Sequence, residues 1–189
     1  MTIEMPMVAP LPPPAPPLPA EEWLRPSTAD ELPLWMQTPS AQASVGAVGT
    51  AAPRDGESRA DQRDRAARSA RQELARRVAR AVDASLTTWE SQQHTPLPGW
   101  IDVCDECARK TAVAAVRLSV IREQWTNPRN GELALRVSVE SARGDDITRA
   151  ALDAVTTDPG LDAATQHAFL VWAQGGAFAA ALTRNLAAP

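Results

Sequence analysis

SRADQRDRAARSARQELARRVARAVDASLTTWES, residues 58–91, is the stretch of this sequence that decides the fold. Large apolar side chains recur at helical spacing in its second half, at positions 74, 78, 82, 86 and 89. Ser58 and Asp61 have the spacing of a helix-entry capping pair, in which side chains accept the first unpaired amides. The stretch therefore predicts one long amphipathic helix over residues 58–91.

The segments that follow predict further helices, each bounded by turn residues. HTPLPGW at 94–100 carries two prolines and a glycine, which predict a reversal of the chain. A second helix is expected from Asp102 to about Trp125, a third from Asp145 to about Thr157, and a last one over 161–186.

Residues 132–142, ELALRVSVESA, alternate apolar and polar side chains as a strand does. A lone strand has no partner for its backbone, and no second convincing strand is visible in the sequence. We therefore expect these residues to be helical as well. The predicted fold class is all-α, a bundle of about four to five helices over roughly 58–188.

The first 56 residues differ in composition from the rest of the chain. Twelve of the 17 prolines lie at or before Pro53, and LPPPAPPLP at 11–19 favours extended polyproline II geometry. Small and polar residues over 37–56 indicate a flexible spacer. We predict a disordered proline-rich tail over 1–56 and a folded domain over 57–189, which could also self-associate through its helices.

Charge and cysteine content narrow the class of protein. A formal charge of −4 and a pI near 5.2 disfavour a general polyanion binder. The N-terminus has no basic region followed by an apolar stretch, so no secretory signal is predicted, and two cysteines do not make a disulfide framework. A cytoplasmic protein with reduced thiols fits these features.

The CDEC motif at 104–107 could offer two thiolates to zinc, but a tetrahedral site needs two more ligands. The remaining obvious ligands are His94 and His167. We favour Cys104 and Cys107 as two small buried thiols on a helix face. The sequence shows no catalytic signature such as a phosphate loop or a nucleophile elbow, so we predict neither a cofactor nor an enzyme.

Arginine is concentrated at the start of the long helix, because the segment from Arg59 to Arg80 contains eight arginines and three acidic residues. This local excess is the plausible surface for nucleic acid or an acidic partner, and phosphate contact by it would be strongly salt-dependent. A solvated helix face is the simpler interpretation. The candidate residues are Arg68, Arg71, Arg76, Arg77 and Arg80.

The last helix is uncharged from Ala163 to Thr183, which raises the question of a membrane span. Polar residues interrupt it, and Gly175 and Gly176 favour a kink. A buried core helix is the better interpretation, so no membrane span is predicted.

Two apolar islands in the tail are each preceded by acidic residues, EEWLRP at 21–26 and DELPLWM at 30–36. Tryptophan in a chain without a local core is typical of a docking motif, and the acids would direct it to a basic surface. The candidate partner-binding residues are Trp23, Leu24, Leu32, Leu34, Trp35 and Met36, within motifs at 21–26 and 30–37.

These patterns together predict a non-enzymatic adaptor or accessory protein. Its tail would bind a protein partner through the two linear motifs, with the helical domain as the platform. The first alternative is a nucleic-acid-associated factor that uses the arginine-rich helix at 59–80. The second is a small zinc protein built on the cysteines and histidines.

Overall fold

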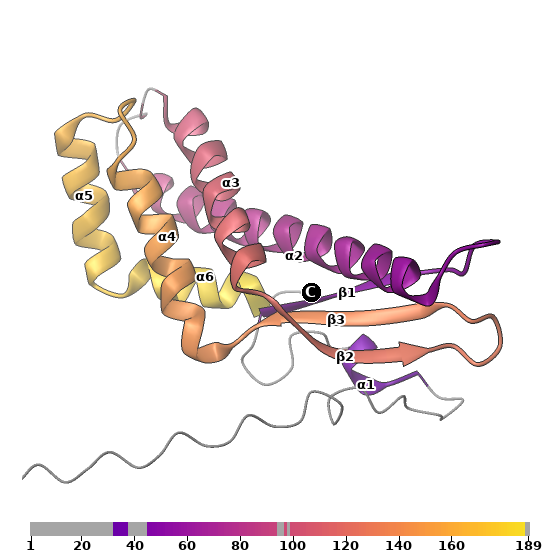
Figure 1. Ribbon diagram of the computed structural model, residues 1–189. Helices are drawn as coiled ribbons and strands as arrows, with labels where there is room; N and C mark the ends of the chain where they lie inside the picture. The colour runs from indigo at the N-terminus through magenta and orange to yellow at the C-terminus, as the bar shows by residue number, and fades with distance from the viewer. Residues whose placement is uncertain (1–31, 38–44, 94–96, 98, 188–189) are drawn as a thin grey trace, which may run out of the picture.

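The computed structural model describes residues 32–37, 45–93, 97 and 99–187, and these residues form helices packed to one side of a small antiparallel sheet (Figure 1). The elements in chain order are α1 (Leu34–Gln37), β1 (Val45–Ala51), α2 (Arg59–Glu90), α3 (Trp100–Leu118), β2 (Val120–Thr126), β3 (Leu133–Val139), the 3₁₀ turn η2 (Ser141–Arg143), α4 (Gly144–Thr156), α5 (Ala163–Gln174) and α6 (Ala177–Ala187).

The long helix predicted over 58–91 is confirmed as α2. Ser58 caps it, its hydroxyl accepting the amide of Asp61 at 3.1 Å. The predicted apolar stripe is buried, and Leu74, Val78 and Val82 are fully enclosed. Helix α2 packs against β1 and β3 as well as against α3 and α6. It is therefore the element around which the rest of the domain is built (Figure 1).

The sheet has the strand order β1-β3-β2, with both pairings antiparallel. β2 and β3 are joined by a hairpin over TNPRNG, where Asn127 Oδ1 accepts the Arg129 amide at 2.9 Å and Asn130 Oδ1 accepts the Glu132 amide at 2.9 Å. Gly131 has a φ of 69°, which favours glycine at that position. The residues expected to end a helix thus form a hairpin loop, in which the Gly131 amide donates to the Asn127 carbonyl at 2.9 Å.

The prediction of an all-α fold is wrong, because the described residues include this three-stranded sheet and form a mixed α/β fold. Residues 133–139 are β3, the central strand, in place of the expected helix over 132–142. The helix expected to reach Trp125 ends at Leu118, and Val120–Thr126 form β2. Part of the expected spacer, Val45–Ala51, forms β1. The alternation in β3 was therefore the correct signal.

Strand β1 crosses α2 at very short range, and Gly49 is the residue that permits it. A Cβ at Gly49 would lie 2.1 Å from the backbone nitrogen of Ala70 and 2.4 Å from the carbonyl oxygen of Ala66. Side chains between strand and helix are therefore small at this crossing. The same small residues made β1 resemble a spacer in the sequence.

The two faces of the sheet have different surroundings. Leu133, Leu135, Val137 and Val139 point towards α2 and join the core. The alternate residues of β3 point to the opposite face, which we call the outer face, and Ala134, Arg136 and Ser138 are nevertheless 1%, 8% and 2% exposed. Both faces of the central strand are thus buried.

An aromatic cluster joins the far end of α2 to the later helices. The rings of Trp89 and Trp100 are 4.6 Å apart, and Trp89 meets Phe169 edge to face at 5.3 Å. The expected helix at 145–157 is confirmed as α4 within one residue at each end. The last expected helix is two helices, α5 and α6, because Gly176 adopts a φ of 78° between them.

Candidate partner-binding surfaces

The second tail motif lies partly within the described residues, which begin at Leu32. Leu32 and Leu34 are 55% and 73% exposed, whereas Trp35 and Met36 are half-buried. Residues 34–37 form the single helical turn α1, in which the Met36 amide donates to the Pro33 carbonyl at 2.9 Å. Apolar side chains are thus presented to solvent here. The first motif, with Trp23 and Leu24, lies outside the described residues.

The candidate arginines of α2 do not form one face. Arg77 donates two hydrogen bonds to the Leu186 carbonyl, at 3.2 and 2.8 Å, and so holds the end of α6. Arg76 and Arg80 both form ion pairs with Glu73, at 3.0 and 3.6 Å. Arg68 is exposed and Arg71 is half-buried. The positive charge is therefore divided between structural contacts, ion pairs and solvent.

Cys104 and Cys107 share the buried face of α3, as predicted for small thiols on a helix face. Burial raises the pKa of each thiol to about 12, so both are protonated at neutral pH. The Cys107 thiol donates to the Ala151 carbonyl at 3.4 Å and thereby joins α3 to α4. This environment favours inert core thiols over a nucleophile or a metal ligand.

The histidines do not complete a zinc site with these thiols in the described part of the chain. His167 is exposed on α5, while His94 lies outside the described residues. Across the described ranges, no group of three or more His, Cys, Asp or Glu side chains is arranged to hold a metal ion. None of the helices in those ranges is long and apolar enough to cross a membrane.

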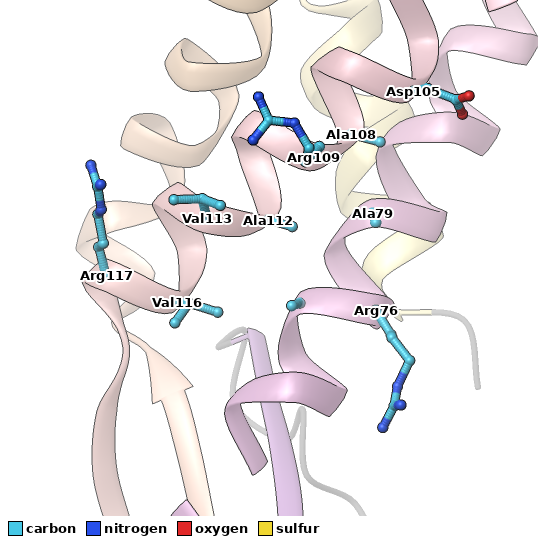
Figure 2. A pocket seen from close by; sticks show the side chains of 10 residues that line it. Arg76, Ala79, Asp105, Ala108, Arg109, Ala112, Val113, Val116 and Arg117 are labelled. Carbon is cyan, nitrogen blue, oxygen red and sulfur yellow. The ribbon is translucent and has the colours of Figure 1, made fainter. Parts of the chain in front are cut away.

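A groove of about 680 Å³ runs between α2 and α3, and it was not predicted from the sequence (Figure 2). Its floor consists of small residues at helical spacing, Ala75 and Ala79 from α2 with Ala108 and Ala112 from α3. Small side chains on two adjacent helices leave a depression that larger ones would fill. The alanine pairs at i, i+4 in both helices were the signal for it.

Arginines border this apolar floor on both sides. Figure 2 shows Arg76 on the α2 side and Arg109 and Arg117 on the α3 side, with their guanidinium groups directed away from the floor. Val113, which is 42% exposed, adds an apolar contact at the edge, and Asp105 is the acid that lines the groove. Arg109 is held by Glu106 at 2.6 Å. An apolar floor with a cationic border suits an apolar segment that carries acids.

No protein-family model matches this chain, and no curated protein is significantly similar to it.

Proposed function

We propose that this protein is a non-enzymatic adaptor that binds a protein partner through its N-terminal tail, with the folded domain as the platform. The observation that carries the proposal is the exposure of Leu32 and Leu34 in a segment of six residues. Two large apolar side chains held in water are expected where a partner covers them. The acids at Asp30 and Glu31 precede them in the sequence and favour a partner with a basic border.

The folded domain supplies a second surface for the same role. The α2/α3 groove is open, apolar at its floor and bordered by arginines. Arginine forms planar, bidentate pairs with carboxylates, so acids of a partner would compete with Glu73 for Arg76 and with Glu106 for Arg109. A partner that contacts both surfaces gains affinity from their linkage within one chain.

The two alternatives receive less support from the geometry. A nucleic-acid surface requires arginines on one exposed face, whereas Arg77 holds α6 and Arg76 shares a carboxylate with Arg80. A zinc site requires thiolates, whereas burial raises the pKa of both thiols. We also propose a cytoplasmic location, which the two unbridged cysteines support.

The proposal is tested by partner capture with the full-length protein. We expect a specific protein to be retained by the wild type and lost when both Leu32→Asp and Leu34→Asp are introduced, because charge opposes burial in an apolar contact. Val171→Asp is the matched control, since Val171 is 57% exposed on α5, which is drawn apart from α1 in Figure 1. Trp23→Ala tests the contribution of the first motif. An identical set of captured proteins for wild type and double variant would contradict the proposal.

A further inference from the structure

The outer face of the sheet is buried although no helix of the core packs on it. Within the described residues, α2 covers the opposite face, and α3 to α6 pack on α2 and on one another. Trp125 is only 4% exposed and lies on the outer face, beside Ala134 at 1% and Arg136 at 8%. Something other than these helices must exclude water from this face.

The polar groups on the outer face are also shielded from water. Arg136 Nε lies 2.8 Å from Glu123 Oε2 in an ion pair between the central and edge strands. The Trp125 Nε1–H is buried and has no hydrogen-bond acceptor among the described residues. A buried N–H donor without an acceptor is costly, so this group marks a place where another part of a chain should sit.

The segment before β1, residues 32–37, carries apolar side chains that are partly buried against some other part of the protein. A single helical turn such as α1 is too short to bury its own side chains, yet Trp35 and Met36 are half-buried. Their neighbours Leu32 and Leu34 are exposed. In the view of Figure 1, α1 is drawn at the β2 edge of the sheet, whereas α2 is drawn towards the β1 edge. The segment therefore has one side against protein and one side in water.

The length of the connection allows this segment to reach the outer face. Val45 pairs with Val139 and Trp125 with Ala134, so Val45 and Trp125 are two strands and five residues apart. At about 3.3 Å per residue and about 4.8 Å per strand, this separation is roughly 20 Å. Eight links join Gln37 to Val45, and a chain of that length spans up to about 27 Å.

We propose that the outer face of the sheet is a docking site for residues 32–37 of the same chain. Trp35 and Met36 hold the segment against Trp125 and its neighbours, and Leu32 and Leu34 are thereby presented outward. The idea that the outward leucines contact a partner rests on the proposed function. The docking itself does not require a partner and is tested separately.

The test uses nuclear magnetic resonance of the full-length protein labelled with ¹⁵N, in which each indole N–H gives its own signal. Trp125→Phe identifies the Trp125 signal. We expect this N–H to exchange slowly with water in the wild type and at least roughly tenfold faster in Trp35→Ala/Met36→Ala, since docking is lost. Leu32→Ala/Leu34→Ala is the matched control from the same segment and should leave the exchange rate unchanged.

Two results would overturn the docking proposal. The first is free exchange of the Trp125 N–H in the wild type, which would mean that the outer face is open. The second is slow exchange that persists in Trp35→Ala/Met36→Ala, which would mean that another part of the chain covers the face. Neither result bears on the capture experiment with the outward leucines, so failure of the docking and failure of the partner proposal are distinguishable.

A second measurement covers the case in which the Trp35→Ala/Met36→Ala variant unfolds, which would also change the signals of the core residues Trp89 and Trp100. A nitroxide attached at Gln37→Cys, an exposed position, is introduced into the otherwise wild-type chain. The buried native thiols resist labelling because burial raises their pKa to about 12. We expect the amide signals of Ala134 and Ser138 to be broadened. Unbroadened signals at both positions would overturn the proposal.

Discussion

Replacing Gly49 with alanine should destabilise the domain strongly, because the new side chain has no room between β1 and α2. The new methyl group would lie 2.1 Å from the Ala70 nitrogen and 2.4 Å from the Ala66 oxygen. Ordinary van der Waals contacts of a Cβ atom begin at about 3.4 Å, so strand and helix must separate by roughly 1 Å. Overpacking usually costs about 1–3 kcal/mol, and here both obstacles are backbone atoms that cannot rotate away. We expect a loss of about 3 kcal/mol or more.

The assay is urea unfolding followed by circular dichroism, with the free energy of unfolding as the measured quantity. Gly144→Ala is the control, because a Cβ at Gly144 meets no atom within 4 Å. That control should be neutral or slightly stabilising, by up to about 1 kcal/mol, since alanine restricts the unfolded chain. Equal stabilities for the two variants would refute the close crossing of β1 and α2.

Three further predictions concern single interactions. Gln62→Leu removes a buried amide that donates to two backbone carbonyls, at 2.8 and 3.0 Å, and should lower the free energy of unfolding by about 1–3 kcal/mol in the same assay. Cys104 and Cys107 should resist a thiol reagent at pH 8 until the protein is denatured, because with a pKa of about 12 only about one thiol group in ten thousand is ionised. Rapid labelling of the folded protein would contradict the burial of these thiols. A hydrogen bond from Arg65 lowers the pKa of Glu57 in the folded state, so this carboxylate stabilises the fold above its ordinary pKa and stops doing so as the pH falls through the lowered value. Glu57→Gln should therefore flatten the loss of stability on acidification below about pH 4.5. An unchanged dependence of stability on pH in this variant would count against the Arg65–Glu57 pair.

The helices could be predicted where a single helix face carries the signal. The stripe from Leu74 to Trp89 and the cap at Ser58 fixed the bounds of α2, because capping and periodicity are local properties. The bounds of α4 were also predicted within one residue, although Asp145 lies in its first turn and does not cap it. Turn residues were recognised correctly at 126–131, but a turn ends a strand as readily as it ends a helix. The type of element on either side was therefore open.

The sheet could not be predicted because each strand depends on residues distant in the sequence. Val45–Ala51 consists of glycine, alanine, valine and threonine, and these small residues reflect contact with α2 rather than a spacer. β2 has few fully buried side chains and lies at the edge of the sheet. Without these two partners, the alternation in β3 had nothing to pair with.

Among the candidate surfaces, some could be predicted from local sequence and others depend on the fold. Exposure of Leu32 and Leu34 agrees with a motif chosen from local composition alone. The α2/α3 groove requires knowledge of which helices are adjacent, so its alanine floor could not be recognised from the sequence. The outer face of the sheet requires strand register, since register decides that Trp125 and Arg136 share a face.

The measurement that tests the adaptor proposal most directly is photo-cross-linking from the outward position of the tail. A photoreactive phenylalanine is placed at Leu34 in one version of the full-length protein and at Val171 in another, because both side chains are exposed. On irradiation in cells that produce the protein naturally, position 34 should yield a discrete covalent adduct with a second protein, and position 171 should not. Absence of an adduct at position 34, or the same adducts from both positions, would contradict the claim that this segment binds a partner.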